Sequence, residues 1–278
     1  MKKRQTSKIV AFIFLTIMSV IWIVPLLYGI FTSFKSQSEL LTHGARLLPI
    51  EWVLTNYQEL LIDNTSTPLV RWFLNSLFIA TMNTLLVLFV VSLSAFAYSR
   101  LHFKGRNQIF TFLLATMMFP GVVNLIPLYK IVDVLGWVNT PWAMIVPGAA
   151  GAMNIFLVKQ FMDGIPKDYD EAAQIDGASE LTIFRKIILP LIKPILTVIT
   201  LFTFTGSWND FLWPSIVFND IEKMPITSGL QLLQGMYQSK PTLLMAGALI
   251  AIVPTFIIYL FAQKYFLESM SLSGGVKG

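Results

Sequence analysis

The sequence predicts an all-α polytopic membrane protein with six transmembrane helices, and two features of the chain support this fold class. First, 55% of the 278 residues are hydrophobic and only 13% are charged, and the mean hydropathy is +0.68. Soluble globular domains carry about 25% charged residues, so most of this chain is solvated by something other than water. Second, long uncharged runs recur, and a helix that crosses a bilayer needs about 20 mostly apolar residues.

Six such runs follow one another, and we interpret them as a single transmembrane domain over residues 1–278. The first run begins after a basic N-terminus, but it is too long for the apolar part of a signal peptide and is interpreted as an uncleaved helix. The fifth run is short and becomes a full span only when it is extended towards both interfaces. The predicted spans are residues 9–34, 72–99, 107–129, 134–158, 193–213 and 241–263.

The charge distribution predicts the orientation. If the N-terminus is inside, most of the 20 Lys and Arg residues fall in inner segments. Cytoplasmic loops of membrane proteins carry this excess of basic residues, so both termini are predicted to be cytoplasmic. The formal net charge of +5 then fits a lipid bilayer surface and not a nucleic acid. The longest outer segment, residues 35–71, is either a solvated loop or a small cap that contacts an external partner.

Catalytic and metal-binding residues are not expected in this chain. It has no cysteine and only two histidines, His43 and His102, which lie far apart in the sequence. It also lacks the Gly-x-x-x-x-Gly-Lys-Ser/Thr loop that binds the phosphates of ATP. We therefore expect no catalytic residue, metal site or cofactor within the chain.

The segment 163–190, between the fourth and fifth spans, is predicted to form two short helices with a glycine between them. Pro166 suits a first helical position, and acidic residues follow it in the first turns, where the helix dipole favours them. Gly177 is a natural helix stop, and Ser179 suits the cap of a second helix. Two prolines then bend the chain into the fifth span: Pro190 and Pro194.

Small side chains give this elbow a surface without bulk. Ala172 and Ala173 lie next to Glu171, so the first helix could fit closely into a groove of another protein. The alternative is a helical linker whose alanines only follow helix propensity.

The spacing of this elbow resembles the signature of permease subunits of ABC importers. The matching residues are Glu171-Ala172-Ala173, Gly177, Ile187 and Leu189-Pro190. Other stretches are similar to the carbohydrate branch of that family, the maltose-type permeases that depend on a binding protein. These stretches are Asn75-Ser76, Asp176-Gly177-Ala178-Ser179, Trp208-Asn209 and Gly275-Val276-Lys277-Gly278. The resemblance covers about residue 75 to the end, but Glu268-Ser269-Met270 stands where the branch tends to have a glycine-containing run.

The resemblance implies an ABC type I importer permease architecture in which the elbow is a cytoplasmic coupling-helix loop. The chain would form half of a pathway for a di- or oligosaccharide in the cytoplasmic membrane of a bacterium or archaeon. The implied partners are a second homologous permease subunit, an ABC ATPase dimer that binds ATP and Mg²⁺, and an extracytoplasmic sugar-binding protein. The residues implied in coupling to the ATPase are Glu171, Ala172, Ala173, Asp176, Gly177, Leu189 and Pro190.

Polar side chains within the spans are the candidates for the substrate pathway, because such groups usually face a bundle interior or a cavity. The candidates are Asn83, Asn124, Asn154, Trp208, Asn209 and Asp210. Asparagines in spans also join helices to each other, Trp208 could belong to an aromatic belt, and Asp210 could lie at the outer interface.

Two other functions remain open at this point. A permease for an amino acid, phosphate or metal would carry the same core signature, although spans without His and Cys disfavour a metal. A secondary transporter or channel would need buried titratable pairs or an inverted repeat, and neither is visible in the sequence.

Overall fold

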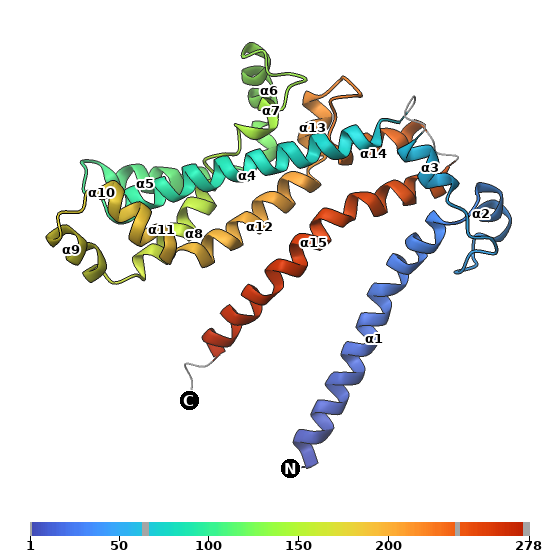
Figure 1. Cartoon of the computed structure of the whole chain (residues 1–278), viewed down its shortest axis with the longest axis horizontal. Helices are drawn as coiled ribbons and strands as arrows, with labels where there is room; N and C mark the ends of the chain where they lie inside the picture. The colour runs from blue at the N-terminus through green and yellow to red at the C-terminus, as the bar shows by residue number, and fades with distance from the viewer. Residues whose placement is uncertain (1, 63–66, 237–239, 275–278) are drawn as a thin grey trace. The chain divides into compact units, whose positions relative to one another are not determined.

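A computed structural model of the chain describes residues 2–62, 67–236 and 240–274, and every regular element within them is a helix (Figure 1). The all-α fold class is therefore confirmed. Three helices are long and apolar enough to cross a bilayer, or up to five if each of two bent helix pairs forms one span. The count of six spans stays a prediction.

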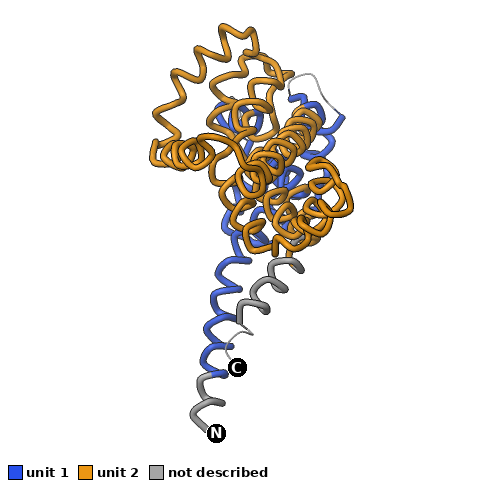
Figure 2. Tube along the Cα trace, turned by 90° about the vertical axis from the view of Figure 1, so that its left-hand side faces the viewer, with its two compact units in different colours: residues 1–71, 229–253 blue, residues 72–228, 254–278 orange. Residues whose placement is uncertain are grey.

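The chain divides into two compact units. The single transmembrane domain over residues 1–278 stays a prediction. Residues 1–71 and 229–253 form the first unit, and residues 72–228 and 254–278 form the second (Figure 2). The first unit contains α1 (Lys2–Ser33), α2 (Gln37–His43), α3 (Thr55–Leu61), most of α14 (Ile226–Met236) and the beginning of α15 (Pro241–Gly274). The terminal residues 275–278, which carry part of the family resemblance, lie outside the described residues.

The described residues of the segment 35–71 form a folded cap and not a simple solvated loop. Its centre is Asn56, whose Nδ2 donates to the carbonyl oxygens of Ser33 at 2.8 Å and Lys35 at 2.9 Å. Thr242 at the start of α15 donates to Asn56 Oδ1 at 3.1 Å. The Nζ of Lys35, which is fully buried, donates to the carbonyl oxygen of Arg46. These bonds satisfy buried polar groups that a loop in water would leave to solvent.

The second unit is built on α4 (Leu69–Ser99), most of which lies in this unit. The other helices of the unit are α5 (Arg106–Thr116), η1 (Gly121–Asn124), α6 (Leu125–Val134), α7 (Trp142–Ile145), α8 (Ala152–Asp163), α9 (Asp168–Ile175), α10 (Glu180–Ile183), η2 (Phe184–Ile188), α11 (Leu189–Leu191), α12 (Lys193–Asn209) and α13 (Leu212–Val217). η1 is a 3-10 helix and η2 a π-helix.

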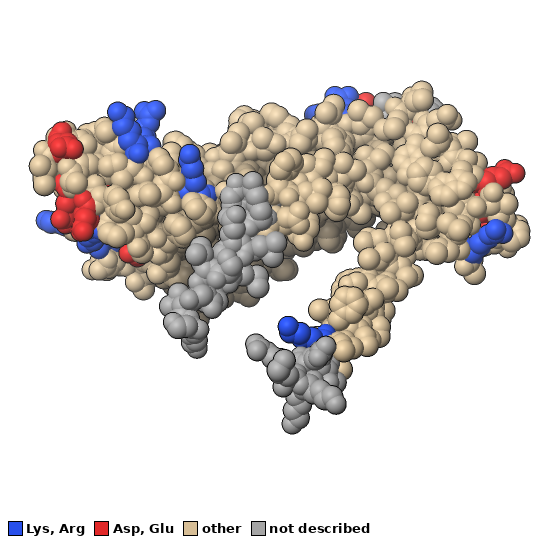
Figure 3. All heavy atoms as spheres, turned by 60° about the horizontal axis from the view of Figure 1, so that its bottom comes forward, with Lys and Arg blue, Asp and Glu red and all other residues tan. Residues whose placement is uncertain are grey.

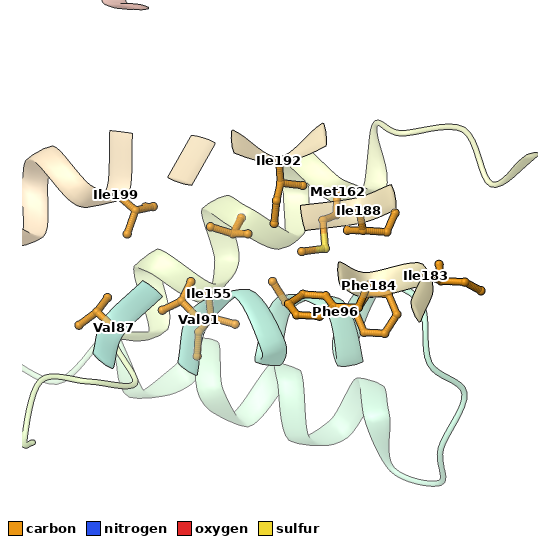
Figure 4. Close-up of a cluster of buried hydrophobic side chains, with 12 residues drawn as sticks. Val87, Val91, Phe96, Ile155, Met162, Ile183, Phe184, Ile188, Ile192 and Ile199 are labelled. Atoms are coloured by element: carbon orange, nitrogen blue, oxygen red, sulfur yellow. The ribbon is translucent and has the colours of Figure 1, made fainter. Parts of the chain in front are cut away.

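One apolar cluster holds these helices together (Figure 4). α4 contributes Val87, Val91 and Phe96, and side chains of α8 and of the α10–α12 segment pack against them. The rings of Phe96 and Phe184 lie 5.1 Å apart between centroids. This cluster connects the segment that follows α9 directly to α4.

Bends occur where the sequence places proline. The pair α5 and η1–α6 bends by 94° around Pro120. The segments before and after residue 192 bend by 75° between Pro190 and Pro194, which confirms the bend predicted for these two prolines. The predicted fourth span, 134–158, differs more, since α7 and α8 are separate helices. The residues between them include Pro147, which lacks the N–H that a continuous helix requires.

Candidate functional site

The predicted elbow is present at the end of the second unit that carries α9 (Figure 1). Gly177 has a φ of +78°, a conformation that costs side-chain-bearing residues free energy, and it turns the chain between α9 and α10. Ser179 caps α10, because its Oγ accepts a hydrogen bond from the Thr182 N–H at 3.4 Å. The helix–glycine–helix geometry is confirmed, with one correction. α9 begins at Asp168, so Pro166 lies before the helix instead of at its first position.

The outer face of α9 combines charge with exposed apolar side chains. Glu171 and Ala172 are exposed, Ala173 is half-buried, and Ile175 is 87% exposed. Tyr169 is also exposed. Figure 3 shows acidic side chains gathered at the end of the second unit where α9 lies. Exposed apolar residues framed by charge are typical of a protein contact surface.

The remaining residues predicted for coupling lie around this surface. Asp176 follows the last residue of α9 and is exposed, like Gly177 beside it. Leu189 is half-buried at the start of α11, and Pro190 is exposed next to it. The inner side of the elbow is different, since Ala173 and Ala178 pack against the apolar cluster.

An ion pair that the sequence analysis missed joins α9 to the end of α4. Arg100 Nε lies 2.8 Å from Asp170 Oδ2, and the two side chains are only 6% and 12% exposed. Arg100 Nη2 also donates to the Ile165 carbonyl oxygen at 2.9 Å. A cavity of about 170 Å³ adjoins the pair and is also lined by Glu171 and Glu180.

A second cavity, of about 290 Å³, lies between helices of the second unit. Its lining residues are Asn83, Leu128, Met144, Pro147, Gly148, Gly206, Ser207, Asp210 and Trp213. Of the residues predicted for the substrate pathway, it brings together Asn83 from α4 and Asp210 from the end of α12.

The side chains of Asn83, Asp210 and Trp213 in this cavity are held in place by hydrogen bonds. Asn83 Nδ2 donates to the Ile145 carbonyl oxygen at 2.9 Å. Asp210 Oδ1 accepts from the Trp213 N–H at 3.4 Å, and Trp213 Nε1 donates to the Ala143 carbonyl oxygen at 2.9 Å. The cavity therefore presents an amide, a carboxylate and an indole in a fixed arrangement.

The other candidates lie elsewhere. Trp208 is 1% exposed and packs between Phe73 and Phe204, with ring centroids at 5.3 and 5.8 Å. Asn209 is exposed, and so is Asn124 at the end of η1; neither lines this cavity. Successive residues of a helix point about 100° apart, so sequence neighbours do not share one environment.

Comparison with known proteins identifies the family. Residues 91–271 match the model of the "Binding-protein-dependent transport system inner membrane component" family. The chain belongs to this family. The match confirms the resemblance to ABC importer permeases that was drawn from the elbow signature, and the sugar transporters among the relatives confirm the carbohydrate branch.

Relatives match the permease over its whole length. The arabinooligosaccharide transport permease AraQ of Halalkalibacterium halodurans is 36% identical over 99% of this chain and 100% of its own. The maltodextrin transport permease MdxG of Bacillus subtilis is 33% identical over 99% and 98%. A crystal structure of a bacterial ABC transporter involved in the import of the acidic polysaccharide alginate aligns with a TM-score of 0.85 and 25% identity, covering 96% of this chain and 98% of that one. The permease therefore has the ABC importer permease fold.

Proposed function

We propose that this permease forms half of the translocation pathway of an ATP-driven importer for a di- or oligosaccharide. A second homologous permease supplies the other half, a solute-binding protein delivers the sugar from outside, and an ATPase dimer binds ATP and Mg²⁺ inside. The names of the relatives support a sugar as substrate, since they include transporters of arabinooligosaccharides and maltodextrin. In this arrangement both termini are cytoplasmic and the chain spans a bacterial or archaeal cytoplasmic membrane.

The observation that carries the proposal is the two-sided construction of the elbow. α9 exposes Ile175 and Ala172, while Ala173 and Ala178 behind it pack on the cluster that joins α4, α8 and α12. We assign to α9 the role of the coupling helix, docked in a cleft of one ATPase. Closure of the ATPase dimer on ATP then moves α9 together with the packed helices and switches the pathway between inward-facing and outward-facing states.

Glu171 is the charged contact in this mechanism. It is exposed in the isolated chain, so it is available to a basic residue of the ATPase. Docking would shield the pair of Glu171 and this basic residue from water. A hydrogen bond between charged groups is stronger than one between neutral groups.

The cavity between α4 and the end of α12 is proposed as part of the sugar pathway. Asn83 and Asp210 supply amide and carboxylate groups that pair with sugar hydroxyls, and the Trp213 indole offers an apolar face. The lining glycines, Gly148 and Gly206, have no atom within 4 Å of an added Cβ, which leaves room for a ligand.

Purification of a tagged copy from native membranes in a mild detergent, followed by mass spectrometry, tests the proposal. We expect an ATPase, a second permease and an exported binding protein in the same complex. The binding protein is then screened against oligosaccharides to name the cargo. Recovery of the chain alone, from a detergent in which a related importer stays intact, would contradict the proposed function.

A further inference from the structure

The contact between α9 and the rest of the chain is unusual in its chemistry. Among the residues of α9, the one that is buried is Asp170, a charged residue. Its partner Arg100 follows the last residue of α4, and the guanidinium reaches both Asp170 and the Ile165 carbonyl oxygen. The Arg100 side chain at the end of α4 therefore contacts both the loop before α9 and the first turn of α9.

Both charges also suit the ends of their helices. Asp170 lies in the first turn of α9, where the helix dipole favours an anion, and Arg100 lies just after the C-terminus of α4, where it favours a cation. The pair is largely shielded from water, so the loss of one partner leaves a buried charge without compensation.

α4, the helix that ends next to Arg100, leads to the proposed sugar cavity. Asn83 and Arg100 are separated by about 25 Å at the rise of an α-helix. α4 has no proline or glycine over its whole length, so it lacks the usual causes of a kink. The covalent route from α9, through α10 and α11 into α12, instead contains a bend of 75°.

We propose that Arg100 is a positioning residue for transport, which ties α9 to α4 so that movement of α9 reaches the cavity residue Asn83 through a straight helix. The inference rests on the proposed function, because α9 must be the helix that the ATPase moves. Arg100 contacts Asp170 through Nε and the Ile165 carbonyl oxygen through Nη2, so lysine is predicted to be a poor replacement, since a single ammonium does not reproduce the guanidinium fork.

Distance measurements between spin labels test this inference. The chain contains no cysteine in its sequence, so a pair of introduced cysteines provides the only thiols of this subunit that a spin label can modify. One pair, Gln174→Cys with Phe89→Cys, reports on α9 relative to α4, because both side chains are exposed and neither is assigned to the contact with the ATPase. A second pair, Phe78→Cys with Leu212→Cys, reports on movement of the helices that line the cavity. Both of these side chains are also exposed.

The measurements are made on the complete complex in lipid, with and without Mg-ATP. In Arg100→Met we expect a broadened distance distribution for the first pair. For the second pair we expect the shift on addition of Mg-ATP to fall by about tenfold, while ATP hydrolysis continues. A destabilised chain would instead lose assembly and hydrolysis together. Arg100→Lys keeps the charge without the guanidinium fork and is expected to narrow the first distribution only in part.

Lys159→Met is the matched control, because it breaks a more exposed ion pair, with Asp163 at 2.6 Å, and is expected to behave as the wild type. Distributions and Mg-ATP shifts in Arg100→Met equal to those of the wild type would overturn the inference. If the wild-type complex itself shows no response to Mg-ATP, the proposed function fails, and the first pair alone still decides whether Arg100 holds α9 on α4.

Discussion

Asn83 on α4 donates its side-chain amide to the carbonyl oxygen of Ile145, the last residue of α7, at 2.9 Å. The same side chain lines the cavity that Asp210 reaches from the end of α12. Asn83 therefore binds the end of α7, where the helical segment is broken, and also faces the proposed sugar pathway. Its two roles separate experimentally, because one affects unfolding and the other transport.

Replacement of Asn83 by leucine, which has a similar size, is expected to lower the free energy of unfolding by about 1–3 kcal/mol, since the Ile145 carbonyl oxygen loses its donor. Thermal unfolding of the purified protein in detergent measures this change. Asn124→Leu is the control, because Asn124 is exposed and its replacement should change stability by less than about 0.5 kcal/mol. Equal unfolding temperatures for both variants would contradict the structural role of Asn83.

Reversal of the charge at Glu171 should abolish coupling without removing the protein from the membrane. In Glu171→Lys, we expect uptake to fall by about tenfold or more, as for loss of a central contact at an interface. Uptake and membrane content are measured together, with Asp133→Lys on the exposed surface of α6 as the control. Normal uptake by Glu171→Lys would refute the assigned contact.

Trp208 should act through packing. Trp208→Ala removes an indole that stacks on Phe204 and meets Phe73, so we expect a loss of about 3–5 kcal/mol in the free energy of unfolding. Asn209→Ala, one position later and exposed, should stay within about 0.5 kcal/mol of the wild type. If Trp208→Ala left stability intact and changed only the affinity for sugar, a direct contact with the substrate would be the better explanation.

The turn at Gly177 should tolerate no side chain well. Gly177→Ala is expected to cost about 1–2 kcal/mol, because a Cβ is unfavourable at a φ of +78°. Amide hydrogen exchange in α9 and α10 detects the local opening, which should become faster. Gly121→Ala is the control, as that glycine has open space and an ordinary φ. Unchanged exchange in the Gly177 variant would argue against a strained turn.

The elbow was predictable because its determinants are local. Gly177 stops one helix and Ser179 caps the next, and both signals depend on residues within a few positions. The bend between Pro190 and Pro194 follows in the same way. The division of the predicted fourth span was not anticipated, because its apolar composition suits a continuous helix until the Pro147 position is considered.

The site itself depends on tertiary packing and was predicted only in part. Trp208 and Asp210 are two positions apart, yet Trp208 lies in the core and Asp210 reaches the cavity. The rotation of α12 about its axis determines which of these positions faces the cavity. Arg100 and Asp170 lie far apart in sequence, and no pattern rule pairs them. The signal available in the sequence was the sign of each charge, since the negative Asp170 suits the start of α9 and the positive Arg100 suits the end of α4.

The central claim is most directly tested by sugar uptake into proteoliposomes that contain the complete complex. We expect a labelled oligosaccharide, chosen by screening the co-purified binding protein, to accumulate only when that protein is outside and Mg-ATP is inside. Dissipation of proton and sodium gradients should leave this uptake unchanged. Uptake that follows an ion gradient and ignores ATP would contradict the assignment of this permease to an ATP-driven sugar importer.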